Sequence, residues 1–307
     1  MRIAVIGAGA MGSFFGGHLS LHHEVLLVDV NKTQVDMINE RGVMIYEPDG
    51  SHISCRPSAA VNTKNMIAAD LVILLVKAVF SRSALYSNSS LIGENTYLLT
   101  LQNGSGHEDT LLDFVDHDHL LIGTTQHACS MMGYGEVRHT GKGRTYIGSL
   151  NGVTPKVEEI VCALDDVGLE TYAAQNIWKM VWDKLILNAS ASVLTGILQV
   201  PPGFIAQNSG AWAMCCTLIR EAAEVALAEG LEFDVNQKIA EVRAICEANP
   251  KGLTSIYADL CEGRRTEVDA ISGSVIRASR RNGIPAPTHE AMVDLVHAME
   301  ARQTQIG

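Results

Sequence analysis

The sequence predicts an α/β domain with a doubly wound sheet, followed by an all-helical domain. In the N-terminal half, short apolar runs alternate with helical segments, as in parallel sheets covered by helices. Residues 71–76 (LVILLV) are continuously apolar, which is typical of a strand buried on both faces. Strand patterns almost disappear after Asn176, and helical periodicity replaces them. We therefore predict two domains, residues 1–175 and 176–307.

The first thirty residues contain the most informative motif. Residues 1–6 (MRIAVI) form an apolar run, and a second run at 24–28 ends in Asp29. Between them lie a helical segment and a turn made of Gly7, Ala8, Gly9, Ala10, Met11 and Gly12. This strand, turn, helix and strand with a terminal acidic residue is the fingerprint of a Rossmann-like dinucleotide-binding domain.

Each part of this motif has a physical role. Gly7 allows the tight turn, Gly9 lets a pyrophosphate approach the backbone, and Gly12 allows close packing of helix and sheet. The free N–H groups at the helix N-terminus suit phosphate. Asp29 can accept hydrogen bonds from both ribose hydroxyls of an adenosine. The alternative is an ordinary glycine-rich turn with a surface aspartate, and the complete arrangement argues against it.

Composition excludes several classes of function. The net charge of −11 leaves no basic stripe for nucleic acid. The seven cysteines are scattered without a CxxC pair, so we predict neither a metal site nor a disulfide framework. We also expect no signal peptide and no membrane span, because the apolar runs are too short. These features predict a cytoplasmic protein.

Several further elements are expected in the N-terminal half. A helix is predicted over 32–41 and short strands over 42–45 and 52–56. Later strands are predicted over 96–101, 120–125 and 146–148, followed by a helix over 155–167 and a strand over 169–173. Lys77, Asn103 and residues 124–129 each lie at the end of a predicted strand. In doubly wound sheets ligands bind at this edge.

The C-terminal half predicts helices separated by proline and glycine. These helices are expected over 177–198, 210–229, 235–247, 254–264, 267–282 and 289–302. Their long apolar faces could be covered by a second copy of the chain, so a homodimer is possible.

Polar residues interrupt two of these helices. Lys184, Asn188 and Ser192 are spaced to share one face of the first helix, which is otherwise apolar. Either the lysine extends to solvent or the stripe faces a cleft between the domains. In the later segment, Ser255 and Asp259 also share a face. Glu267 lies near a weak capping box, and its charge could simply interact with the dipole at the start of a helix.

Six ordered motifs make the chain resemble the ketopantoate reductases (2-dehydropantoate 2-reductases) over essentially its whole length. They are Gly7–Gly12, Val76–Ala78, Leu101–Gly106, Trp182–Leu185 with Asn188, Ser255–Leu260 and Arg265–Asp269. The resemblance implies that Lys184 is the catalytic proton donor and that Asn103 contacts both cofactor and substrate. It also implies cofactor roles for Lys77, Cys129 and Glu267, and substrate roles for Asn188 and Ser255.

These roles suit hydride transfer to a ketone, because an ammonium can stabilise and then protonate the developing oxyanion. Burial would help by lowering the lysine pKa, and Glu267 would oppose that change. We thus expect Lys184, Asn103 and Glu267 to be the catalytic residues. Asn188 and Ser255 can donate hydrogen bonds to a substrate carboxylate.

The sequence departs from the family at three positions. Ser192 and Pro202 stand where two substrate-binding asparagines are expected, which leaves room for 2-oxo acids other than ketopantoate. Asp29 would repel the 2′-phosphate of NADP and favours NAD, whereas the family usually prefers NADP. Lys32 could partly offset Asp29, so the choice between NAD and NADP stays open.

The leading hypothesis is an enzyme that reduces a small 2-oxo acid, ketopantoate, to the D-2-hydroxy acid with NADPH or NADH. The runner-up is an NAD-dependent D-2-hydroxyacid dehydrogenase for branched or aromatic 2-oxo acids. A non-catalytic dinucleotide sensor is a third hypothesis, and the presence of Lys184, Asn103 and Glu267 argues against it.

Overall fold

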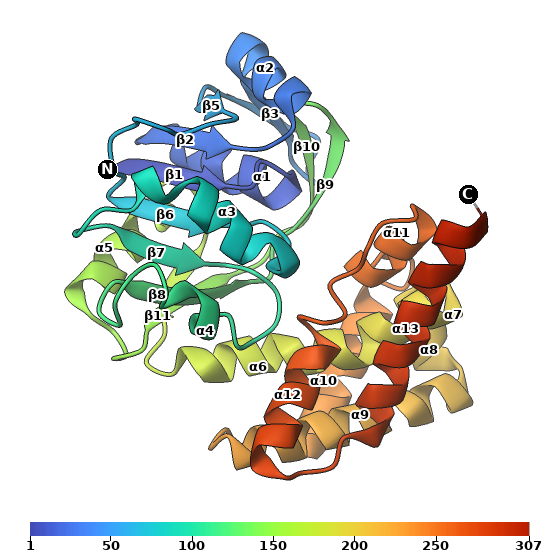
Figure 1. Ribbon diagram of the computed structural model, residues 1–307. Helices are drawn as coiled ribbons and strands as arrows, with labels where there is room; N and C mark the ends of the chain where they lie inside the picture. Colours follow the sequence, from blue (N-terminus) through green and yellow to red (C-terminus); the bar gives the residue numbers. More distant parts are fainter. Residues whose placement is uncertain (307) are drawn as a thin grey trace. The chain divides into compact units, whose positions relative to one another are not determined.

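The computed structural model describes residues 1–306, with side chains described through residue 302. It divides into two compact units. The first comprises Met1–Gln102 and His107–Met180, and the second comprises Asn103–Gly106 together with the chain from Val181 onward. The predicted fold class is confirmed, because the first unit is α/β and the second helical (Figure 1). Our domain boundary between residues 175 and 176 stays a prediction.

The main sheet of the first unit has eight strands in the order β12-β11-β8-β7-β6-β1-β2-β5. They are β1 (Arg2–Ile6), β2 (Glu24–Val28), β5 (Ser58–Ala60), β6 (Leu71–Leu74), β7 (Tyr97–Thr100), β8 (Leu120–Thr125), β11 (Thr145–Ser149) and β12 (Thr171–Ala173). All neighbours pair in parallel except β11 and β8. β6 is buried at every position, as its apolar run predicts.

Helices connect these strands, and Figure 1 shows α3 and α4 on the near side of the sheet. The elements are α1 (Ala10–Leu19), α2 (Lys32–Arg41), η1 (Ala78–Phe80), α3 (Ser81–Ser87), η2 (Ser89–Leu91), α4 (Glu108–Leu111) and α5 (Pro155–Asp165). α2 has the predicted bounds, and Asn31 caps it by accepting from the Gln34 N–H. Phe14 and Phe15 of α1 are both almost fully buried and extend the core.

The prediction of one sheet was incomplete, because four strands form a second sheet in the order β4-β3-β10-β9. These are β3 (Val43–Tyr46), β4 (His52–Cys55), β9 (Ala128–Gly133) and β10 (Glu136–Gly141). The sequence predicted β3 and β4 but missed the β9–β10 hairpin. Most side chains of β9 are exposed, so its sequence carries no alternation of buried and exposed positions.

The helical part of the chain contains α6 (Ile177–Leu187), η3 (Asn188–Ser192), α7 (Val193–Leu198), α8 (Pro202–Gln207), α9 (Ser209–Ala228), α10 (Val235–Ala248), α11 (Ser255–Cys261), α12 (Ser272–Asn282) and α13 (Pro287–Ile306). The expected helix over 177–198 is therefore interrupted by a π-helical turn, η3. By length and composition Ile177–Leu198 could cross a membrane, but its apolar window is 67% buried, as in a core helix.

Two predictions for this part were wrong. The helix expected over 267–282 begins only at Ser272. Thr266 donates from both its backbone N–H and its hydroxyl to Oε1 of Glu300, each at 2.7 Å. These bonds hold the segment before α12 in an irregular conformation, so Glu267 is not on a helix. The Pro201–Gly203 stretch, expected to be only a break, instead starts α8 with Pro202 at its first turn.

Candidate active site

The glycine turn has the geometry that a pyrophosphate requires. Gly7 has a φ of +103°, which favours glycine, and a Cβ there would lie 2.9 Å from the Leu75 carbonyl carbon. A Cβ at Gly12 would lie 1.7 Å from the Gly7 carbonyl oxygen, so the start of α1 can pack closely only with glycine. At Gly9 a Cβ would meet no atom within 4 Å. Open space therefore lies beside Gly9, where a phosphate would approach.

Asp29 is held at the end of β2 by two backbone N–H groups. Its Oδ2 accepts from Ala8 at 2.8 Å, and its Oδ1 accepts from Asn31 at 2.9 Å. These bonds fix the carboxylate beside the glycine turn. Since a carboxylate has about four lone-pair sites, acceptor capacity remains for ribose hydroxyls. The residues present thus fit the adenosine end of a nicotinamide dinucleotide.

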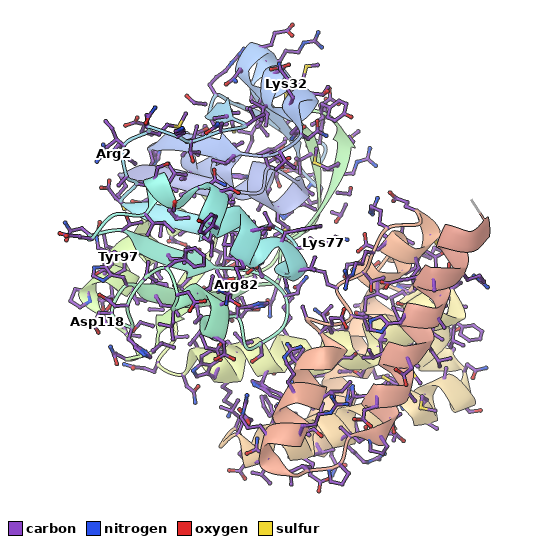
Figure 2. The ribbon with its side chains drawn as sticks, viewed as in Figure 1. Arg2, Lys32, Lys77, Arg82, Tyr97 and Asp118 are labelled. Atoms are coloured by element: carbon purple, nitrogen blue, oxygen red, sulfur yellow. The ribbon has the colours of Figure 1, made fainter. Side chains whose placement is uncertain are left out.

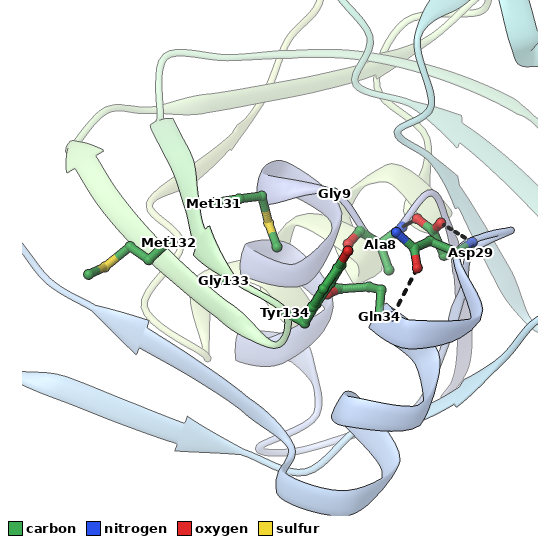
Figure 3. Close-up of a pocket in the computed structure, with 9 residues that line it drawn as sticks. Ala8, Gly9, Asp29, Gln34, Met131, Met132, Gly133 and Tyr134 are labelled. Carbon is green, nitrogen blue, oxygen red and sulfur yellow. Dashed lines mark hydrogen bonds between the residues drawn. The ribbon is translucent and has the colours of Figure 1, made fainter. Parts of the chain in front are cut away.

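A pocket of about 400 Å³ lies at this position (Figure 3). One part of its lining comes from the glycine turn and the β2–α2 connection, namely Ala8, Gly9, Asp29, Asn31 and Gln34. The other part comes from the β9–β10 hairpin, namely Met131, Met132, Gly133 and Tyr134. The expected cofactor residues Gly9 and Asp29 therefore share a pocket with hairpin residues that the sequence did not single out.

The other expected cofactor residues of the first unit differ in their surroundings. The ammonium of Lys32 donates to Oδ1 and Oδ2 of Asp36 at 2.8 and 2.5 Å, so its charge is paired on the exposed face of α2. Lys77 follows β6, the strand next to β1, and precedes η1 (Figure 2). Cys129 lies on β9 opposite His139, and burial raises the pKa of its thiol.

In the second unit, the three expected catalytic residues form one hydrogen-bonded chain. Nζ of Lys184 donates to Oδ1 of Asn103 at 2.8 Å, and Nδ2 of Asn103 donates to Oε2 of Glu267 at 3.0 Å. Asn103 therefore uses both ends of its amide to connect the cation to the anion. The ammonium has two further N–H donors that can face a substrate oxygen.

The protonation of Lys184 is set by two opposing effects. Burial lowers the pKa of Lys184 to about 8, and the negative charge of Glu267 opposes this decrease. An ordinary lysine has a pKa of about 10.4, so this ammonium releases its proton more readily. At neutral pH the side chain is still mostly protonated, which suits a proton donor.

The position of Asn103 depends on the loop that follows β7. Gly104 has a φ of +96°, and a Cβ there would lie 1.8 Å from the carbonyl oxygen of Ala270. The Ser105 N–H donates to Oγ of Ser274 at 3.1 Å, and that hydroxyl donates to the Ser105 carbonyl at 2.9 Å. Arg277 donates to the same carbonyl at 3.3 Å. The loop therefore packs with the helical residues that precede and form α12.

The expected substrate residues lie on two neighbouring elements of the helical unit. Oγ of Ser192 lies 3.5 Å from Oδ1 of Asn188, so the two share a face of the π-helical turn as predicted. Ser255 is exposed in the first turn of α11, and the adjacent Thr254 hydroxyl lies 2.7 Å from that of Thr195. π-Helical turns occur frequently at functional sites, which agrees with this placement.

Three residues with a structural part in these sites escaped the sequence analysis. Gln34 and Tyr134 border the pocket, and Ser274 holds the loop of Asn103. Gln34 had no recognisable signal, because a polar residue in the first turn of a surface helix is usually exposed. The sequence does group large apolar side chains in residues 131–134 (MMGY), and the structure shows that Tyr134 is exposed.

Among the residues that the structure describes, no group of three or more His, Cys, Asp or Glu side chains could hold a metal ion.

Comparison with known proteins identifies relatives of the whole chain. The family model described as "Ketopantoate reductase PanE/ApbA" matches residues 3–152, and its C-terminal counterpart matches residues 176–300. The chain is 30% identical over 299 residues to the 2-dehydropantoate 2-reductase of Halobacterium salinarum, covering 96% of this chain and 98% of that protein. It is 31% identical over 310 residues to the Lactococcus lactis enzyme of the same name, covering 98% of both.

Two solved structures also resemble this chain over almost its whole length. A D-mandelate dehydrogenase with NADH and anilino(oxo)acetate is 32% identical, with a TM-score of 0.92, covering 99% of this chain and 100% of that one. A PanE/ApbA family ketopantoate reductase from Ralstonia eutropha JMP134 is 29% identical, with a TM-score of 0.90 and the same coverage.

Proposed function

We propose that this chain, which belongs to the ketopantoate reductase family, reduces a small 2-oxo acid to the 2-hydroxy acid with a nicotinamide dinucleotide, in the manner of a 2-dehydropantoate 2-reductase. The observation that carries the proposal is the chain from Lys184 through Asn103 to Glu267. It presents a partly buried ammonium whose lowered pKa suits a proton donor.

The glycine turn and Asp29 would hold the cofactor by its pyrophosphate and ribose, and bound NADH or NADPH would supply the hydride. Lys184 then stabilises the negative charge that develops on the carbonyl oxygen and donates a proton to that oxygen. Asn103 keeps the ammonium in place by accepting one of its N–H bonds. Glu267 orients the Asn103 amide and keeps Lys184 protonated at neutral pH.

The substrate carboxylate would be bound by short polar side chains of the helical unit. We assign this role to Asn188, Ser192 and Ser255, which lie on η3 and α11. Asn188 and the two serines can each donate a hydrogen bond to a carboxylate oxygen. Lys77, at the end of β6, is assigned to the nicotinamide end of the cofactor, and Cys129 to a backbone contact with it.

A second candidate differs in substrate and cofactor, namely a 2-oxo acid with a bulky aromatic side chain reduced with NADH. Two observations favour it. Asp29 is fixed beside the glycine turn while Lys32 pairs with Asp36, so a 2′-phosphate would meet a negative charge. The D-mandelate dehydrogenase with NADH and an aromatic 2-oxo acid analogue is 32% identical to this chain.

A paired rate assay tests both candidates. Ketopantoate, benzoylformate and a branched 2-oxo acid are each supplied with NADH and with NADPH. Highest kcat/KM for ketopantoate supports the first candidate, and highest kcat/KM for benzoylformate with NADH supports the second. Absence of turnover with every pair, in protein that binds NADH, would instead support a non-catalytic sensor.

We further propose that the helical unit forms a homodimer through its long apolar faces and that the protein is cytoplasmic. Light scattering of the purified chain tests the first point.

A further inference from the structure

The β9–β10 hairpin contributes an apolar wall to the pocket beside the glycine turn. Met131, Met132 and Tyr134 are 41%, 46% and 51% exposed, which is high for large apolar side chains that lie together. Figure 3 shows the Tyr134 ring extending toward the glycine turn at Ala8 and Gly9, whereas Met132 points away from it. The ring therefore lies on the pocket side of the hairpin.

One buried side chain fastens this hairpin to the glycine turn. Gln34 is 3% exposed, and its Nε2 donates to the carbonyl oxygen of Ala8 at 2.8 Å. Its Oε1 accepts from the N–H of Gly135 in the hairpin turn at 3.0 Å. Both ends of the amide are thus satisfied, and replacing it by an apolar residue would leave two buried backbone groups without this partner.

The base of the hairpin is held as well. Nδ1 of His127, which precedes β9, lies 2.9 Å from Nε2 of His139 on β10. Nδ1 of His139 in turn lies 2.8 Å from Oε2 of Glu47. All three side chains are largely buried, and both histidine rings lie beside Phe14 of α1. A wall fixed at its tip and its base is preorganised, so a ligand loses little free energy in ordering it.

The charge of the lining restricts the ligand. Asp29 is the one charged residue of the lining, which contains no lysine or arginine. We propose that Tyr134 and Met131 form a second wall of the cofactor site, that Gln34 holds this wall against the glycine turn, and that the wall acts with Asp29 to select NADH over NADPH. The inference rests on the proposed function in taking a nicotinamide dinucleotide as the ligand.

The chemistry of the two side chains suits this role. The Tyr134 ring offers an apolar face to the ribose, and its hydroxyl can donate to a diphosphate oxygen. Met131 is flexible and polarizable, so it adapts its shape to an apolar surface. Neither side chain can neutralise a 2′-phosphate.

Calorimetric titration of the full chain tests the proposal with NADH, NADPH and ADP-ribose as probes. We expect Tyr134→Ala to raise the Kd for NADH and for ADP-ribose about tenfold, because an aromatic contact is lost. The Kd for NADPH should rise less, so the ratio of the NADPH Kd to the NADH Kd should fall. Tyr134→Phe should raise the NADH Kd about threefold, since only the hydroxyl is lost. Gln34→Leu should also raise the Kd for NADH about tenfold, because the hairpin is no longer held against the glycine turn.

The matched control is Tyr86→Ala on α3, where the tyrosine is 78% exposed and outside the pocket. Thermal unfolding confirms that each variant is folded. Unchanged affinity for NADH and ADP-ribose in both Tyr134→Ala and Met131→Ala would overturn the proposal. If these two variants still reduce 2-oxo acids with the wild-type KM for NADH, the proposed function stands and only the role of the hairpin wall is refuted. Conversely, Tyr134-dependent NADH binding without any turnover would overturn the proposed function alone.

Discussion

The glycine-turn site and the lysine site of this chain are built in different ways. The first uses backbone N–H groups and one carboxylate, all within the first thirty-one residues. The second uses three side chains from distant parts of the chain: Lys184 and Asn103 are 81 positions apart, and Asn103 and Glu267 are 164 positions apart. A site made of backbone groups binds and orients, whereas a site with a titrating ammonium can move a proton. The two sites should therefore respond to substitution in separable ways.

The sharpest test removes the ammonium. We expect Lys184→Ala to lower kcat about a thousandfold, because general acid catalysis contributes about 10²- to 10⁴-fold. NADH affinity, measured by fluorescence titration, should stay within about twofold, since binding belongs to the glycine-turn site. Lys179→Ala on the same helix, where the lysine is exposed, is the control. A variant at position 184 that keeps more than a tenth of wild-type kcat would remove this lysine from the mechanism.

The converse test removes the carboxylate of the glycine-turn site. Asp29→Ala deletes the acceptor of the Ala8 and Asn31 N–H groups, which is also the proposed acceptor for the ribose hydroxyls. We expect the Kd for NADH to rise about tenfold, which corresponds to about 1.4 kcal/mol, while kcat at saturating NADH changes little. The ratio of NADPH to NADH efficiency should rise. Asp49→Ala, in the turn between β3 and β4 and outside the lining of the pocket, controls for loss of charge. If Asp29→Ala lowered kcat as much as Lys184→Ala does, the two sites would not be separable.

A third test shifts the pKa of the lysine site without breaking its hydrogen bonds. The glutamine in Glu267→Gln can still accept from Asn103 but no longer carries the charge that raises the pKa of Lys184. In its proposed role as the proton donor, Lys184 must be protonated, so kcat should fall as pH rises through its pKa of about 8. In the variant this fall should move to lower pH by about one unit. A pH–rate profile between pH 6 and 10 that keeps its midpoint would show that Glu267 acts only by position.

The glycine-turn site could be predicted from the sequence more completely than the lysine site, for a physical reason. The glycine turn, its helix and Asp29 are neighbours in the chain, so spacing alone predicts their arrangement. The polar stripe of Lys184, Asn188 and Ser192 was also readable, because it follows one helix. Tertiary contacts decided what spacing could not show. They moved Glu267 off α12 and joined the Asn103 loop to the helical residues. Spacing also did not show that the helix expected over 177–198 contains a π-helical turn, η3.

The β9–β10 hairpin was missed because contacts between distant segments fix its position. Most side chains of β9 are exposed, so the period of two that marks a half-buried strand is absent from it. β10 does alternate between exposed and buried positions, but one of its buried residues is the polar His139. Their position is fixed instead by Gln34 and by the pair of His127 and His139, which come from separate elements. Contacts between segments distant in sequence leave no local pattern to read. The family resemblance gave a role to Cys129 on β9 but none to Met131 or Tyr134 near the hairpin turn.

The mildest test loosens the loop that carries Asn103. Ser274→Ala removes the hydroxyl that accepts from the Ser105 N–H and donates to its carbonyl, so Asn103 should be held less firmly against Lys184. We expect kcat to fall about threefold to tenfold at pH 7, with the KM for NADH unchanged, because small misplacements of catalytic groups are costly. Ser272→Ala on the same helix is a matched control, since its hydroxyl is buried without a hydrogen-bond partner in the described part of the chain. If both variants lose activity equally, the effect is one of helix packing. If Ser274→Ala alone lowers kcat and also shifts the midpoint of the pH–rate profile, the loop positions the proton donor through Asn103.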